Sequence, residues 1–131
     1  MKKPPPLDIL VVDDELLIRW SLAEMLAAAG HHVRQASDRE SALRALSEPP
    51  QPPDVIVLDY RLPDSNDLGL LAAIRQRAPQ AQVILMTAFG TPEVIKGAVD
   101  LGAFRVVSKP FEVHAIASLV LEAHDARPKQ A

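Results

Sequence analysis

Several acidic, basic and hydroxyl side chains stand directly after short runs of mostly branched apolar residues. A pair of acids follows residues 9–12, a third acid follows residues 55–58, and two further residues follow later runs. These five residues are Asp13, Asp14, Asp59, Thr87 and Lys109. Carboxylates that gather at one place repel each other unless a cation neutralises them. The group is therefore a candidate site for a hard metal ion and for phosphate.

The spacing of the apolar runs predicts how these residues meet. Short runs separated by amphipathic stretches are typical of parallel strands that are buried on both faces and joined by helices. Ligands of such sheets bind outside the carboxyl ends of the strands, so the five side chains should share one crevice. We expect strands at 7–12, 32–36, 55–58, 83–86 and 104–107, and helices at 15–29, 38–47, 67–77, 92–101 and 113–123.

The polarity of the strands predicts their order in the sheet. The strands expected at 32–36 and 104–107 contain charged residues, whereas the other three are almost wholly apolar. Polar strands belong at the edges of a sheet, and crossovers between parallel strands are right-handed. The predicted fold class is therefore α/β, with a five-stranded parallel sheet in the order 2-1-3-4-5 and helices on both faces, a flavodoxin-like arrangement.

Local signals mark several helix ends. Gly30 and Gly102 stand just past two helices, where a residue in the left-handed conformation is favoured. Ser37 and Glu40 have the spacing of a capping box for the second helix. Thr91, followed by proline, is a favourable start for the fourth helix. The acids at 13 and 14 could instead cap the first helix, which is an alternative to metal binding.

Size and composition fit one domain. The chain has 131 residues, no cysteine and a formal net charge of −3. Its apolar runs are too short to cross a membrane and its start differs from a signal peptide, so we expect a cytoplasmic protein. The lack of a basic cluster argues against direct nucleic-acid binding. We expect a disordered arm at 1–6, one domain at 7–124 and a tail or linker at 125–131.

Four motifs together resemble the receiver domains of two-component response regulators. They are VVDDE (11–15), LDYRLPD (58–64), MTA (86–88) and KPF (109–111). Each motif alone is weak evidence, but all four occur in order at the predicted strand ends. The sequence Ile18-Arg19-Trp20 adds a likeness to receivers of the nitrogen-regulation class of transcriptional activators. Trp20 lies off the apolar face of its helix, so we interpret it as a partly exposed packing residue or a partner contact.

The resemblance implies a role for each residue of the group. Asp59 would be the phosphoryl acceptor, with Thr87 and Lys109 contacting the phosphoryl oxygens. Mg²⁺ would be held by four residues: Asp13, Asp14, Asp59 and, through its backbone carbonyl, Arg61. The peptide bond between Lys109 and Pro110 would be cis.

The resemblance also implies partners. A sensor histidine kinase would supply the phosphoryl group, and phosphorylation would switch the conformation. The signal would leave through the fourth helix, fifth strand and fifth helix, a face that would also form a homodimer, toward an output domain beyond Ala131. A module of the same fold that works without phosphorylation is the alternative function. A phosphatase of the haloacid dehalogenase type is disfavoured, because it needs a second acid where this chain has Arg61.

Two positions depart from the family pattern. Val106 stands where receivers usually carry an aromatic residue, and we expect Phe104, on the same face, to replace that ring in part. Asp67 stands at a turn that often carries glycine. We also hypothesise that Arg61 and Phe89 flank the path of attacking water and set the lifetime of the phosphorylated form.

Overall fold

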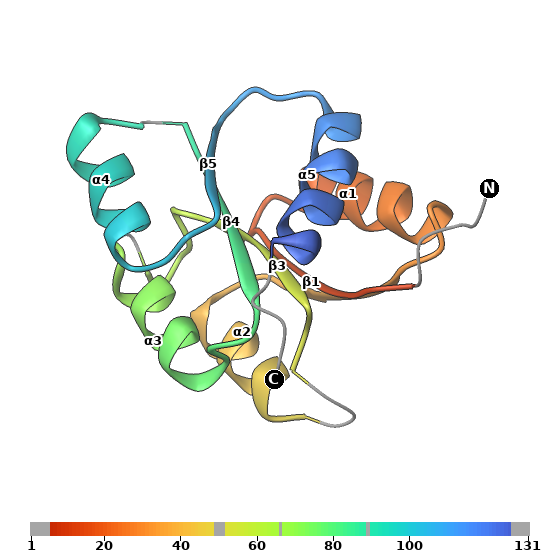
Figure 1. Cartoon of the computed structure of the whole chain (residues 1–131), viewed down its shortest axis with the longest axis horizontal. Helices are drawn as coiled ribbons and strands as arrows, with labels where there is room; N and C mark the ends of the chain where they lie inside the picture. The colour runs from red at the N-terminus through yellow and green to blue at the C-terminus, as the bar shows by residue number, and fades with distance from the viewer. Residues whose placement is uncertain (1–5, 49–51, 66, 89, 127–131) are drawn as a thin grey trace.

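The computed structural model describes residues 6–48, 52–65, 67–88 and 90–126. The expected terminal arm and tail therefore lie mostly outside the described residues, and Phe89 lies wholly outside them. Strands and helices alternate along the whole described chain (Figure 1). The elements are β1 (Asp8–Val12), α1 (Leu16–Ala28), β2 (His32–Ala36), α2 (Arg39–Ser47), β3 (Val55–Asp59), α3 (Gly69–Arg77), β4 (Gln82–Thr87), α4 (Pro92–Asp100), β5 (Arg105–Ser108) and α5 (Val113–Asp125).

The sheet confirms the predicted order and direction. Its five strands are parallel and run β2-β1-β3-β4-β5. The three inner strands are buried along almost their whole length, whereas every residue of β2 and β5 except Ala36 is partly or fully exposed. Arg34 and Arg105 lie in the edge strands, and the acids of the inner strands stand only at strand ends, Asp8 at the start of β1 and Asp59 at the end of β3. This distribution agrees with the polarity argument.

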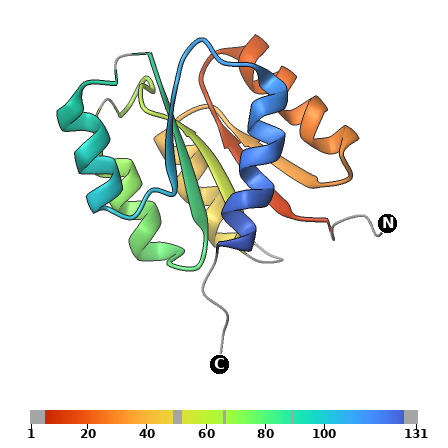
Figure 2. The same cartoon turned by 45° about the horizontal axis from the view of Figure 1, so that its top comes forward.

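The helices form two layers, one on each face of the sheet (Figure 2). One core cluster joins alternate strand residues to α1 and α5, including Leu22, Leu26 and Ile116. The other joins the intervening strand residues to α2, α3 and α4, including Leu71 and Ala98. Because successive strand side chains point to opposite faces, each inner strand contributes to both clusters. This double burial holds the strand ends in fixed positions.

Helix ends agree with the predicted signals except at α2. Gly30 and Gly102 have φ of 99° and 96°, as a left-handed helix end requires. The Thr91 hydroxyl accepts a hydrogen bond from the Val94 amide and caps α4. The prediction of a capping box from Ser37 and Glu40 was wrong.

The capping box of α2 lies one residue later, because the helix begins at Arg39. Asp38 accepts a hydrogen bond from the Ser41 amide at 2.8 Å, and the Ser41 hydroxyl accepts one from the Asp38 amide at 3.3 Å. The third helix also begins later than predicted, at Gly69. The Asp67 carboxylate accepts a hydrogen bond from the Gly69 amide at 2.8 Å, so this acid stabilises the turn into the helix.

Phe104 does not replace an aromatic ring at position 106, and that expectation was wrong. Val106 packs against the core cluster of α2, α3 and α4, whereas Phe104 packs against the cluster of α1 and α5. The physical reason is that β5 begins at Arg105, so the two-residue alternation of a strand does not extend back to Phe104.

Candidate functional site

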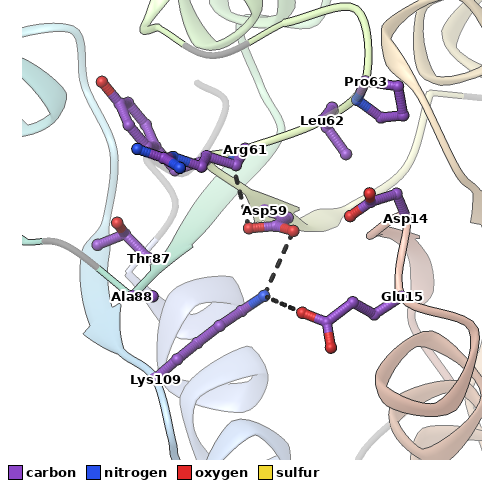
Figure 3. Close-up of a pocket in the computed structure, with 10 residues that line it drawn as sticks. Asp14, Glu15, Asp59, Arg61, Leu62, Pro63, Thr87, Ala88 and Lys109 are labelled. Atoms are coloured by element: carbon purple, nitrogen blue, oxygen red, sulfur yellow. Dashed lines mark hydrogen bonds and ion pairs between the residues drawn. The ribbon is translucent and has the colours of Figure 1, made fainter.

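The carboxyl ends of the inner strands open onto a pocket of about 330 Å³. Figure 3 shows the side chains of Asp14, Glu15, Asp59 and Lys109 directed toward one another in it. The lining residues come from the ends of β3 and β4 and from the segments that follow β1, β3, β4 and β5: Asp14, Glu15, Asp59, Tyr60, Arg61, Leu62, Pro63, Thr87, Ala88 and Lys109. The structure thus brings together the residues that sequence reasoning selected.

Three carboxylates gather at this edge. Asp13, Asp14 and Asp59 each offer an oxygen atom, and these atoms lie within 4.8 Å of one another. Asp13 is fully buried and Asp59 is 5% exposed, whereas Asp14 is exposed. Two buried acids at this separation repel each other, so the cluster needs positive charge nearby.

Lys109 supplies that charge within the protein. Its Nζ atom lies 3.2 Å from Asp13 Oδ2 and 3.3 Å from Asp59 Oδ2, and its side chain is 13% exposed. Its backbone amide donates to the Thr87 carbonyl at 2.8 Å, which places the ends of β4 and β5 side by side. The peptide bond from Lys109 to Pro110 is cis, as predicted.

Glu15 also belongs to the site. It lies in one of the sequence motifs, but we assigned no role to it from the sequence. Its Oε1 atom lies 3.7 Å from Lys109 Nζ (Figure 3). Its backbone amide donates to Asp13 Oδ1 at 2.9 Å. The third acid in the run from 13 to 15 was the available sequence signal. Glu15 is thus the N-cap position of α1 and a rim acid of the pocket.

The surroundings of Asp59 and Lys109 in the pocket shift the pKa values of both side chains. Burial, and to a smaller extent the nearby Asp13 carboxylate, together raise the pKa of Asp59 to about 6, against the opposing effects of Lys109 and of the Arg61 amide. Burial alone would lower the pKa of Lys109, but the Asp59 and Asp13 carboxylates outweigh it and hold that pKa above its usual value. At neutral pH Asp59 is therefore mostly ionised and Lys109 carries its positive charge.

The donor set fits a divalent cation that prefers oxygen. The three aspartates provide carboxylate oxygens only, and the exposure of Asp14 leaves one side of the cluster open to water. Mg²⁺ binds one or two carboxylates and keeps several water ligands. These residues could hold such an ion, whereas a soft metal would need the cysteine or histidine ligands that this pocket lacks.

Comparison with known proteins gives the family of the chain. Residues 9–121 match the model of the response regulator receiver domain. The chain belongs to the receiver domain family. One relative of this receiver domain is the DNA-binding transcriptional regulator NtrC of Escherichia coli K12, 38% identical over 112 residues. A putative NtrX-like response regulator of Rickettsia conorii is 36% identical over 119 residues.

These matches cover most of this receiver domain but little of the relatives. They span 86% and 89% of this chain, and 24% and 25% of the NtrC and NtrX-like proteins. The chain therefore spans about a quarter of the length of these curated relatives. Among solved structures, the receiver domain of NtrX from Brucella abortus aligns with a TM-score of 0.81 and 34% identity, covering 91% of this chain and 99% of that one.

The structure gives the contacts or exposure of three further residues of this receiver domain, which the sequence could not specify. The Arg61 amide donates to Asp59 Oδ1 at 3.3 Å, while its side chain is exposed and directed away from the acids (Figure 3). Trp20 is 53% exposed on α1. His31 is buried, and its Nδ1 atom accepts a hydrogen bond from the Leu7 amide at 3.1 Å. That contact is structural and far from the pocket.

Proposed function

We propose that this receiver domain accepts a phosphoryl group on Asp59 from a phosphohistidine of a sensor histidine kinase, in a reaction that needs Mg²⁺. The observation that carries the proposal is the position of the Asp59 carboxylate. It lies 3.3 Å from the partly buried Lys109 and within 4.8 Å of two further acids in an open pocket. A merely structural aspartate would not require this surrounding charge.

The reaction is a nucleophilic substitution at phosphorus. A carboxylate oxygen of Asp59 forms a bond to the phosphorus atom while the phosphorus–nitrogen bond of the donor breaks, and the imidazole nitrogen keeps that electron pair. The nucleophile must be ionised. With a pKa of about 6, Asp59 is mostly a carboxylate at neutral pH, so no general base is required.

The other residues stabilise charge on the transferred group. Lys109 and the buried Thr87 would contact phosphoryl oxygens. The support is that both line the pocket with Asp59, at the ends of neighbouring strands. Asp13, Asp14, Asp59 and the Arg61 carbonyl would hold Mg²⁺, which when bound neutralises charge on the carboxylates and on the phosphoryl oxygens.

Phosphorylation then acts as a switch. A phosphoryl group adds charge of about −1.5 to −2 beside Thr87, and β4, which ends at Thr87, leads directly toward α4. The outer surface of α4 supports an output role for the α4-β5-α5 face, since Ile95, Val99 and Leu101 are exposed at or just past this helix. We propose that this face contacts the output region or a second copy.

The same proposal includes the boundaries of the receiver domain within the chain. We assign residues 7–124 to the receiver and residues 125–131 to a tail or linker that leads to an output region. The support is the length of the relatives, in which the matching region is about a quarter of the protein. One of those relatives is a DNA-binding transcriptional regulator. Regulation of transcription through a separate output region is therefore the proposed end point.

The direct test is incubation with acetyl phosphate and Mg²⁺, followed by intact mass measurement. We expect a gain of one phosphoryl group, which is lost in Asp59→Asn and abolished by a chelator. Asp100→Asn is the matched control, because Asp100 is an exposed acid paired with Lys96 on α4. A phosphoryl group that still appears in Asp59→Asn would overturn the assignment. No gain in the wild type would favour the module that works without phosphorylation.

A further inference from the structure

The turn that carries Asp13 is supported by an arginine one helical turn away. Within the described part of the chain, no side chain caps the first turn of α1. Arg19, on the second turn, instead reaches back along the helix. Its Nη1 atom donates to the Asp13 carbonyl at 2.9 Å, and its Nε atom donates to Gln35 Oε1 at 3.1 Å.

These contacts hold Asp13 through its backbone rather than through its carboxylate. The Asp13 amide donates to the Ala36 carbonyl at 3.1 Å, so β2 holds one side of the residue. Arg19 holds the other side and is itself anchored to β2 through Gln35. With the carboxylate bound by the Glu15 amide and Lys109 Nζ, Asp13 has its backbone and side chain fixed before any ligand arrives.

We propose that Arg19 is a positioning residue for Mg²⁺, acting through the main chain of Asp13. This inference rests on the proposed function and extends it to a residue that does not line the pocket. The planar guanidinium makes two hydrogen bonds in a fixed geometry, which a lysine cannot reproduce. Fixing the Asp13 backbone keeps its carboxylate directed into the cluster of three acids, so less conformational entropy is lost when the cation binds.

Charge and positioning predict opposite effects, which makes the proposal testable. Arg19 is a cation near a cation site, so a purely electrostatic role predicts that its neutralisation tightens Mg²⁺ binding. A positioning role predicts weaker binding. A role in stability alone predicts an unchanged dissociation constant for the folded protein.

The experiment is isothermal titration of the folded variants with Mg²⁺ alone. For Arg19→Met we expect about tenfold weaker binding, at the lower end of the range for residues that support metal ligands. Arg19→Lys should also weaken binding although the charge is kept. Gln35→Ala removes only the anchor of the guanidinium, so it should weaken binding in the same direction by less than Arg19→Met. If Arg19→Met does not fold, Gln35→Ala and Arg19→Lys decide the question.

Arg75→Ala is the matched control. Arg75 Nη1 donates to the Ala81 carbonyl at 2.6 Å, so it also reaches a backbone carbonyl six residues away, but just before the start of β4 rather than after the end of a strand. We expect its Mg²⁺ affinity to equal that of the wild type. Unchanged or tighter binding in both Arg19 variants would overturn the proposal. Absence of Mg²⁺ binding in the wild type would instead refute the proposed function.

Discussion

Replacement of Asp59 by asparagine should stabilise the fold when no metal is present. In an unfolded chain this carboxyl would ionise near its ordinary value of 3.8, whereas in the fold its pKa is about 6. Between these values the folded state holds a proton that the unfolded state has lost. Stability is therefore lost as the pH rises through this window. Asp59→Asn has no such proton to lose.

The size of the effect follows from the shift. About two pKa units correspond to about 3 kcal/mol, at about 1.4 kcal/mol per unit. The Asp59 side chain is 6% exposed, so solvent screens this contribution little. The difference in unfolding free energy between the variant and the wild type should be small near pH 4 and should grow to about 3 kcal/mol above pH 6. Lys109 would keep its pairing with Asp13.

The assay is urea denaturation followed by circular dichroism, in a chelating buffer at several pH values from 4 to 7.5. Asp100→Asn serves as the control, since its carboxylate lies on the exposed surface of α4 and its loss should give little change that depends on pH. An Asp59→Asn protein that is no more stable than the wild type at pH 7 would refute the reasoning. In that case the Lys109 attraction would equal or exceed the effects of burial and of Asp13.

Three further predictions concern the metal, the donor and the lifetime of the phosphorylated form. Millimolar Mg²⁺ should raise the melting temperature of the wild type by binding only the folded site, and this rise should be smaller in Asp13→Asn, since one carboxylate ligand is lost; equal rises would show that Asp13 is not a ligand. Trp20→Ala should slow phosphoryl transfer from a histidine kinase but not from acetyl phosphate, because Trp20 is exposed on α1, outside the pocket; equal slowing with both donors would contradict a partner contact. Small residues in place of Arg61 and Phe89 should change the rate of dephosphorylation measured after the donor is removed, and an unchanged rate would contradict a role beside the water path.

The sequence predicted the fold and the meeting of the five residues for one physical reason. In a parallel sheet every strand ends at the same edge. The position of a residue directly after a strand can therefore be predicted without knowing its side-chain contacts. Asp59 ends β3 and Thr87 ends β4, while Asp13 and Lys109 directly follow β1 and β5. Strand order followed from the polarity of β2 and β5.

The contacts that sequence reasoning missed depend on where helices begin. Arg19 reaches the Asp13 carbonyl because α1 starts at Leu16, which places position 19 above the turn. A shift of one residue would rotate that side chain by about 100° around the helix. The prediction of the α2 capping box was wrong for the same reason, since the helix starts one residue later than expected. Helix starts are set by packing as well as by local signals, so these contacts were not predictable from spacing alone.

The charge arrangement of the pocket explains how one site can be both destabilising and functional. Lys109 lies at nearly equal distances from Asp13 and Asp59, 3.2 and 3.3 Å, so one internal cation is shared between two buried acids. Three aspartates and Glu15 surround this one lysine, so acidic groups outnumber basic ones in the cluster. Burial and then the Asp13 carboxylate raise the pKa of Asp59 there. An excess of acidic groups favours a divalent cation, and a bound cation in turn permits the approach of an anionic phosphoryl group. The repulsion that weakens the fold without metal would therefore also favour metal binding at the proposed phosphorylation site.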